Sequence, residues 1–368
     1  MDELKRTIAR EASVLGQYAS ALPTPALLVD LPAMERNLAT IEAFFRSRQA
    51  KLRPHFKNHR VLALADRQLA GGAIGITCAR LWQAEALVQH GIASVLVANE
   101  IAGDAMIRRF VELSHAAPVI VAVDNARIVD DMARIAGDAR GLLNVVVDVD
   151  VGLGRCGVPP GDAPLELARR VVSKGLKLRG VMGYEGHLQP LLPGPDKECA
   201  VRAAMKILVD ARICLESTGI PVEIVTCGGT GDFAIAGSYP GVTEIQAGSY
   251  LLMGTCYASA APQFEVALTV LSTVISKTPG DRLVVDAGAK AISGERGLPS
   301  VKGQPRMRVR ALHAEHAPIE IHGDVEAEVG DQLELFVHYQ DGTMNLHNRM
   351  FGVRNGKVEE VFKIEHGT

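Results

Sequence analysis

The chain has 368 residues, of which 48 % are hydrophobic and 22 % are charged. Its 39 basic and 42 acidic residues leave a formal net charge of −3, so composition shows no bias toward nucleic acid or an anionic membrane surface. The length exceeds one average domain, although an α/β barrel of about 250 residues is commonly a single domain. From the length we therefore expect a barrel with an additional, smaller domain. From the charge we expect the protein to act on a small molecule.

The cysteines and the N-terminal segment indicate in which cellular compartment the protein is expected. The six cysteines are widely spaced and include no C-x-x-C pair, which is typical of reduced thiols rather than a secreted disulfide framework. The first twenty residues lack the apolar core of a signal peptide, and no apolar run is long enough to span a bilayer. We expect a cytoplasmic protein with no membrane partner.

From residue 25 to about 250, short β-branched runs alternate with amphipathic stretches such as 31–45 and 81–88, where apolar residues repeat at three- and four-residue steps. This alternation predicts a parallel sheet covered on both sides, and we favour a (β/α)8 barrel over an open doubly wound sheet. There are nine such runs but only eight strands in the barrel, and the pattern does not identify which run lies outside the barrel. These runs occupy residues 26–30, 51–57, 73–78, 94–99, 119–124, 144–150, 178–185, 223–229 and 244–248.

After residue 262, strand-like runs follow one another with Gly, Pro, Asp and Asn between them and with no helix-like segment. This change predicts a second, mostly antiparallel β domain. We place the barrel at residues 20–262 and the β domain at 263–368, with residues 1–19 associated with the β domain.

The segment Leu52–Arg60 places Lys57 between His55 and His59, where a hydrophobic strand is expected to end. In an extended strand, residues two apart share a face, so the three side chains would project together. A lysine surrounded by other cations binds its proton less tightly, as a Schiff-base nucleophile requires. Lys57 is therefore the first candidate for chemistry, with both histidines as catalytic neighbours.

Two glycine-rich turns follow apolar strands near the end of the predicted barrel. Backbone N–H groups in such turns can approach an anion closely, and barrels commonly build a phosphate site on their last strands. The first turn, CGGTGD at 227–232, offers Gly229, Thr230 and Gly231, and the second, QAGSY at 246–250, offers Gly248, Ser249 and Tyr250.

These segments resemble those of the D-threonine aldolase and D-serine dehydratase family, pyridoxal-phosphate enzymes with the alanine-racemase type of fold. Residues 54–59 resemble P-H-x-K-x-H, and residues 149–158 match V-D-x-G-x-G-R-C-G-V almost residue for residue. The resemblance implies that Lys57 carries pyridoxal 5'-phosphate and that both glycine-rich turns hold its phosphate. It also implies that Arg155 lies near the cofactor phenolate or the substrate carboxylate, and that Tyr184 lies near the pyridine ring.

The sequence departs from this family at the metal ligands. Family members bind a divalent metal through H-x-D or H-x-C, whereas here Tyr339 stands at the histidine position and Asp341 at the acid position. If the alignment with the family motif is shifted by one residue, His338 takes the histidine position instead. Phenolate is a poor substitute for imidazole on Zn²⁺, so the resemblance leaves a Mn, Mg or Zn site at His338 and Asp341 open.

The resemblance implies a lyase that acts on a D-configured β-hydroxy-α-amino acid, most simply by retro-aldol cleavage to glycine and an aldehyde. Proton transfer from the β-hydroxyl would fall to Tyr339, His338, Asp341 or His347. Dehydration of a D-serine or hydroxyaspartate type of substrate and amino-acid racemisation are alternatives, and a cofactor-binding protein without turnover is an alternative of another class. By analogy with the fold we expect a homodimer.

Overall fold

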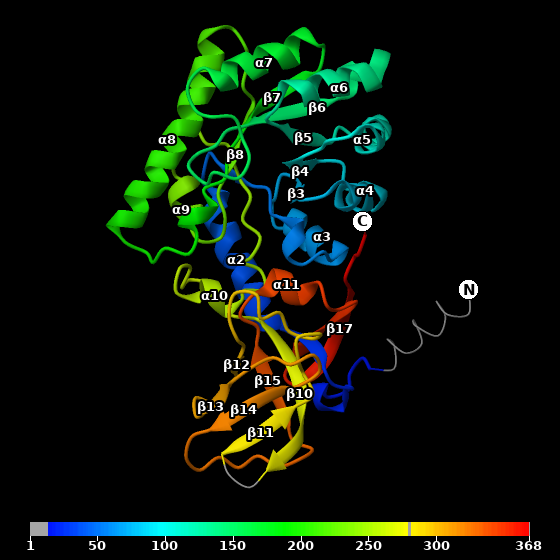
Figure 1. Cartoon of the computed structure of the whole chain (residues 1–368), viewed down its shortest axis with the longest axis vertical. Coiled ribbons are helices and arrows are strands. Elements are labelled where there is room, and N and C mark those ends of the chain that lie inside the picture. Colours follow the sequence, from blue (N-terminus) through cyan, green and yellow to red (C-terminus); the bar gives the residue numbers. More distant parts are fainter. Residues whose placement is uncertain (1–13, 279–280, 368) are drawn as a thin grey trace, which may run out of the picture. The chain divides into compact units, whose positions relative to one another are not determined.

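A computed structural model describes residues 14–278 and 281–367 of the chain. They form two compact units (Figure 1): unit 1 contains residues 14–38 and Ser249–His366, and unit 2 contains Ala39–Gly248 and Gly367. The division falls inside helix α2 (Leu31–Arg46). The predicted barrel differs from unit 2 at both ends, because residues 20–38 and 249–262 belong to unit 1. Of residues 1–19, those up to 13 lie outside the described residues, and Tyr18 pairs with Lys357 within unit 1.

Unit 2 is built on eight parallel strands in the order β2-β9-β8-β7-β6-β5-β4-β3, which confirms the barrel predicted from the alternating pattern. Every residue of β5, β6 and β8 is buried, because the barrel interior is filled and helices cover the outer face. The strands are β2 (Lys51–Leu52), β3 (Ile76–Cys78), β4 (Val95–Glu100), β5 (Ile120–Val123), β6 (Asn144–Asp148), β7 (Lys177–Met182), β8 (Ile224–Cys227) and β9 (Glu244–Ile245).

Amphipathic helices cover the outside of these strands, and Figure 1 shows α4 to α8 along the outer side of β3 to β8. Within the barrel, side chains from the neighbouring strands β4 to β8 pack into one cluster, including Leu96, Val146 and Ile224. Among the described residues, no helix is long and apolar enough to cross a membrane. The helices are α3 (Leu62–Ala70), α4 (Leu81–Gln89), α5 (Asp104–Ala116), α6 (Ala126–Ala136), α7 (Ala163–Ser173), α8 (Pro195–Ser217) and the short α9 (Phe233–Ala236).

The first and last strands in this order, β2 and β3, close the ring through a few backbone hydrogen bonds. The N–H of Ile74 donates to the carbonyl of Leu52 at 3.0 Å, and the N–H of Thr77 donates to the carbonyl of Pro54 at 2.9 Å. His55 and Thr77 form an isolated parallel bridge. The segment that leads to Lys57 therefore lies at the closure of the barrel.

The ninth strand-like run, residues 26–30, lies in unit 1 as β1 (Ala26–Asp30). It pairs antiparallel with β10 (Leu268–Thr278) and parallel with β16 (Arg349–Arg354). Its first four residues are buried, so its sequence looks like a barrel strand.

Unit 1 contains a nine-stranded, mostly antiparallel sheet, as predicted, with the β1 and β16 pair as its parallel exception. Its core includes Leu22, Leu28, Leu271 and Val358. The expectation that no helix interrupts the strands is corrected by one short helix in the described part of this unit, α11 (Gln340–Met344). The remaining strands and the helix before them are α10 (Thr255–Ala258), β11 (Arg282–Val285), β12 (Ser300–Val301), β13 (Met307–Val309), β14 (Ala317–Ile321), β15 (Gln332–Phe336) and β17 (Lys357–Lys363).

Candidate active site

Lys57 lies in a 3-10 turn, Phe56–Asn58, and not in an extended strand. Strand β2 ends at Leu52, and a proline at position 54 removes a backbone donor before the turn begins. The imidazole Nδ1 of His55 then accepts the N–H of Lys57 at 3.4 Å, so a side chain satisfies a donor that a strand would have paired. The predicted extended geometry is therefore corrected, although Lys57 still follows the carboxyl end of a barrel strand.

His55 is buried and neutral. Burial lowers its pKa well below the usual value, and the positive charges of Lys57, His59 and Arg155 lower it further. The expectation that this histidine adds positive charge beside Lys57 is corrected, because desolvation disfavours the imidazolium. His55 remains a candidate catalytic group as a neutral imidazole.

His59 is also neutral and has a structural environment. Burial lowers its pKa to about 4. Its Nδ1 accepts the N–H of Val61 at 3.0 Å, and its Nε2–H donates to the Gln68 side-chain oxygen at 3.2 Å. Both ring nitrogens therefore bind to α3, one at the residue before its start and one at Gln68 near its end. The predicted positive charge of His59 is corrected as well.

Arg155 extends from a compact loop that follows β6. The Asp150 carboxylate accepts the N–H groups of Gly152 and Gly154 at 2.9 and 3.0 Å, which fixes the loop backbone. The guanidinium carbon of Arg155 lies 5.4 Å from the centre of the Tyr184 ring. The structure thus brings together two residues that the sequence analysis assigned to the cofactor.

Acidic side chains gather near Arg155 at the ends of β4, β5 and β6. The pKa of Asp148 is raised to about 8, first by burial and then by the charges of Glu100 and Asp124, while Arg155 opposes the shift. One potential ligand atom from each of Glu100, Asp124 and Cys156 lies within 4.8 Å of the others. Sequence analysis assigned no role to Glu100, whose only signal was its position after a strand-like run, or to Cys156, which lies in the family-like segment 149–158. The cluster can hold a proton at neutral pH.

The glycine-rich turn after β8 is fixed by Gln189 and Asp232. The N–H of Gly229 donates to Asp232 Oδ1 at 2.9 Å, and the N–H of Gly231 donates to Gln189 Oε1 at 2.8 Å. Gln189 Nε2 donates to Asp232 Oδ2 at 2.6 Å. A Cβ atom at either glycine would lie 2.5 Å or less from an oxygen of Gln189. These glycines therefore accommodate Gln189, which sequence analysis did not assign, and Thr230 is buried in the same turn.

The turn after β9 meets the turn that carries Lys57. The N–H of His55 donates to the carbonyl of Ala247 at 3.2 Å, and a Cβ atom at Gly248 would lie 2.8 Å from the carbonyl oxygen of His55. Strand β9 pairs with β2 on one side and with β8 on the other. Three neighbouring strand ends thus gather the Lys57 turn, Gly248 and the glycine-rich turn.

The remaining predicted residues belong to unit 1. Tyr250 is fully buried, and its ring centre lies 5.7 Å from that of Phe264, so its side chain contributes to the core. The carbonyl of Ser249 accepts a hydrogen bond from Gln340 Nε2 at 3.0 Å. Their role in holding a phosphate stays a prediction.

Tyr339 lies beside Arg296, which the sequence analysis did not identify. The Arg296 guanidinium carbon lies 4.4 Å from the centre of the Tyr339 ring, and Arg296 Nη1 donates to the Tyr257 hydroxyl at 3.3 Å. Burial raises the pKa of Tyr339 to about 12, with a further contribution from the Asp341 carboxylate. The phenol therefore keeps its proton at neutral pH.

The two histidines of unit 1 have different surroundings. His338 Nδ1 lies 2.8 Å from Thr255 Oγ1. His347 donates from Nε2–H to the carbonyl of Ala291 at 2.8 Å, and burial lowers its pKa. In the part of the chain that the structure describes, neither His338 nor Asp341 belongs to a set of three His, Cys, Asp or Glu ligand atoms that lie within 4.8 Å of one another.

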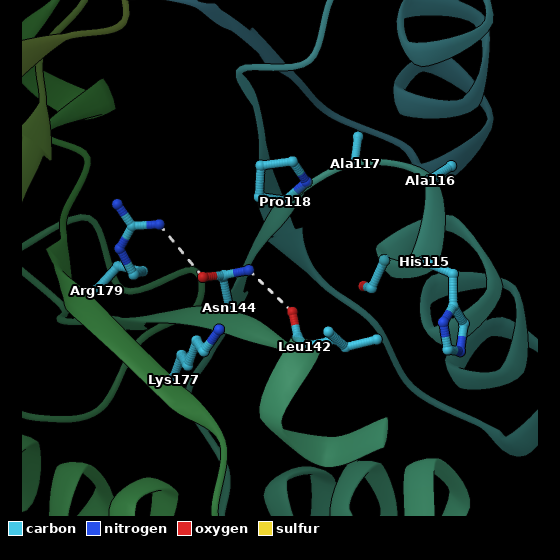
Figure 2. Close-up of a pocket in the computed structure, with 9 residues that line it drawn as sticks. His115, Ala116, Ala117, Pro118, Leu142, Asn144, Lys177 and Arg179 are labelled. Atoms are coloured by element: carbon cyan, nitrogen blue, oxygen red, sulfur yellow. Dashed lines mark hydrogen bonds between the residues drawn. The ribbon is translucent and has the colours of Figure 1, made fainter. Parts of the chain in front are cut away.

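The opposite ends of the barrel strands form a separate pocket of about 440 Å³ (Figure 2). Arg179 Nη1 donates to the Asn144 side-chain oxygen at 3.2 Å, and Asn144 Nδ2 donates to the carbonyl of Leu142 at 2.9 Å. Arg179 also forms an ion pair with Glu223. Since barrel enzymes use the carboxyl ends of their strands, we place the active site at the Lys57 end.

Comparison with known proteins extends over almost the whole chain. Residues 29–256 match the family model of the alanine racemase N-terminal domain, and residues 267–353 match a putative serine dehydratase domain. The chain is 34 % identical to a D-threonine aldolase of Arthrobacter sp, over 95 % of this chain and 94 % of the relative. It is 33 % identical to a 3-hydroxy-D-aspartate aldolase of Paracoccus denitrificans (strain Pd 1222), over 95 % and 93 %.

Two solved structures are similar over the same extent. The crystal structure of a D-threonine aldolase from Filomicrobium marinum has a TM-score of 0.91 and 32 % identity, and covers 95 % of this chain and 97 % of its own. The D-threo-3-hydroxyaspartate dehydratase from Delftia sp. HT23 has a TM-score of 0.87 and 26 % identity, and covers 95 % and 100 %.

Proposed function

Because the chain belongs to the D-threonine aldolase and D-serine dehydratase family, we propose that it is a pyridoxal-phosphate-dependent lyase that cleaves a D-configured β-hydroxy-α-amino acid. The products would be glycine, or a close relative of glycine, and an aldehyde. The observation that supports this proposal best is the contact between Gly248 and His55, because it brings a glycine-rich turn to the turn of Lys57.

The side chains at these strand ends fit pyridoxal phosphate. Lys57 supplies a primary amine next to a neutral imidazole, and Arg155 supplies a permanent positive charge close to the Tyr184 ring. When bound, the cofactor takes up the electrons that are released when the Cα–Cβ bond breaks. In this proposal Lys57 holds the cofactor, Tyr184 lies beside its ring, and Arg155 stabilises negative charge on the cofactor or the substrate.

Cleavage also requires a group that removes the proton of the β-hydroxyl. The raised pKa of Tyr339 makes its phenol a proton donor rather than an acceptor at neutral pH. His347 is neutral with a hydrogen on Nε2, so its Nδ1 can accept a proton. Between these two candidates, we therefore propose His347 rather than Tyr339 as the base.

Dehydration is the second candidate, because the similar Delftia structure is a hydroxyaspartate dehydratase. That reaction removes the Cα proton and expels hydroxide, a poor leaving group that a metal would activate as a Lewis acid. Glycine and aldehyde would indicate cleavage, whereas a keto acid and ammonia would indicate dehydration.

The test is a panel of D- and L-β-hydroxy amino acids, including threonine and 3-hydroxyaspartate. Purified protein is assayed with Mn²⁺, with Mg²⁺ and with EDTA, and glycine, aldehyde, keto acid and enantiomer are measured together. We expect glycine and aldehyde from D-substrates, with Lys57→Ala as the inactive control. Keto acid without glycine, a change of enantiomer alone, or no turnover of any substrate would each reject the proposed cleavage.

A further inference from the structure

Two buried carboxyl groups, Glu185 and Asp232, lie next to the glycine-rich turn. Glu185 is fully buried, and within the described residues neither of its carboxyl oxygens has a well-aligned hydrogen-bond donor. The Asp232 carboxyl is within hydrogen-bonding reach of it, and burial followed by the charge of Asp232 raises the pKa of Glu185 well above its usual value. Two carboxylates are both acceptors, so a hydrogen bond between them requires a proton.

The charged groups around Glu185 and Asp232 can neutralise one negative charge on this pair, but not two. Lys197 is 2 % exposed and lies within the electrostatic influence of Asp232. Glu244, a buried carboxylate at the start of β9 that also raises the pKa of Cys227, already forms an ion pair with Arg53 at 2.8 Å. Burial and the neighbouring carboxylates raise the pKa of the Cys227 thiol, which therefore stays neutral. The set thus contains one lysine cation and two carboxyl groups, so a single proton makes it neutral.

Asp232 connects this pair to the backbone of the turn. Its Oδ1 accepts the N–H of Gly229, and its Oδ2 accepts Gln189 Nε2, whose Oε1 in turn accepts the N–H of Gly231. Any change in the charge of the pair therefore acts on the turn directly. Glu185 lies 47 positions before Asp232 in the chain, so no local motif connects the two residues.

We propose that Glu185 and Asp232 share one proton and act as positioning residues for the turn at 227–232, so that loss of this proton weakens binding of the cofactor phosphate. The inference rests on the proposed function, since it takes pyridoxal phosphate as the ligand. With the proton in place, the Lys197, Glu185 and Asp232 set is neutral. Without it, an extra buried negative charge opposes a phosphate anion in a region of low dielectric constant.

The test uses Glu185→Gln, because an amide keeps a donor toward Asp232 but cannot ionise. Dissociation constants for pyridoxal phosphate are measured between pH 7 and 9.5 on the full-length protein freed of cofactor. Above the titration of the pair, the parent should lose affinity relative to the variant by about tenfold for each pH unit, the limit for one linked proton. Pyridoxal, which has no phosphate, should show no such divergence. Glu216→Gln, at a surface ion pair on α8, should follow the parent.

A second measurement separates this inference from the proposed function. The pKa of Glu185 is raised in the folded state, so its favourable contribution is present at low pH and is lost as pH rises toward the folded value. Between pH 5 and 9 the cofactor-free parent should therefore lose stability relative to Glu185→Gln. When both proteins also carry Asp232→Ser, this difference should become smaller, because the charge of Asp232 is removed while the burial of Glu185 remains. If the parent and Glu185→Gln showed the same dependence on pH both in cofactor affinity and in stability, the inference would be overturned. If neither protein bound pyridoxal phosphate, the proposed function and the phosphate role would both fail, and unfolding would still decide whether the proton is shared.

Discussion

Replacing Tyr339 with histidine should create a divalent-metal site that the parent protein lacks or holds weakly. The Tyr339 phenol has a pKa of about 12, and Asp341 is close enough for its carboxylate to raise that pKa. A histidine at this position would therefore place an imidazole near a carboxylate, which is a combination that divalent metals bind.

The cost of using the parent phenol as a ligand follows from its pKa of about 12. Deprotonation at pH 7 spans about five pH units, which corresponds to about 7 kcal/mol that coordination must offset before any net binding. An imidazole with its ordinary pKa of about 6.5 is already mostly unprotonated at pH 7. The guanidinium of Arg296, 4.4 Å from the Tyr339 ring, also repels a cation at this position.

The assay measures Mn²⁺ binding by calorimetry and lyase activity with EDTA or Mn²⁺. The parent should ignore EDTA, whereas Tyr339→His should bind Mn²⁺ and become dependent on it. Tyr18→His is the matched control, because it replaces another phenol that lies beside a cation, Lys357, and should gain no metal. The reasoning is refuted if the parent carries one tightly held metal per subunit, or if EDTA inactivates it and Mn²⁺ restores it, since His338 would then already be a ligand.

Three further predictions concern the lysine, the assembly and acid stability. Borohydride should attach the cofactor permanently to Lys57 in a yellow protein, and an adduct mapped to Lys290, an exposed lysine paired with Glu315, would overturn the assignment. Sedimentation should show a homodimer, and a fully active monomer at micromolar concentration would contradict this. Because the pKa of His59 is about 4 in the folded protein, its contribution to stability is present above pH 6.5 and is lost as pH falls toward 4, by about 3 kcal/mol in total. Denaturant unfolding should show a smaller loss over this range for His59→Gln, and an unchanged loss would reject the assignment.

The barrel was predictable because its strands and helices have different hydrophobic periods, but the pattern could not exclude β1. A short run that is buried on both sides looks the same in either sheet, and the partners of β1 are more than 200 positions away in the chain. Only tertiary pairing shows that it belongs to unit 1. The position of Lys57 after a barrel strand was predictable, because it depends on the local sequence and not on pairing with distant segments.

The electrostatic state of the candidate site was not predictable from sequence. The charges of His55 and His59 depend on burial, which reverses the effect expected from a row of basic residues. Gln189 and Asp232 act on the same turn although they lie 43 positions apart, so no local motif could connect them. Similarly, the interaction of Arg296 with Tyr339 arises from folding of unit 1.

The closure between β2 and β3 affects how the barrel moves. The seam relies on the N–H groups of Ile74 and Thr77, whereas β5 and β6 pair over four consecutive residues. Local opening should therefore begin at this seam, and these two amides should exchange with deuterium sooner than those of the central strands. Strand β2 stays paired with β9 during such an opening, so the Lys57 turn keeps its place beside Gly248. The barrel can therefore open locally between β2 and β3 while the groups that would bind the cofactor stay together.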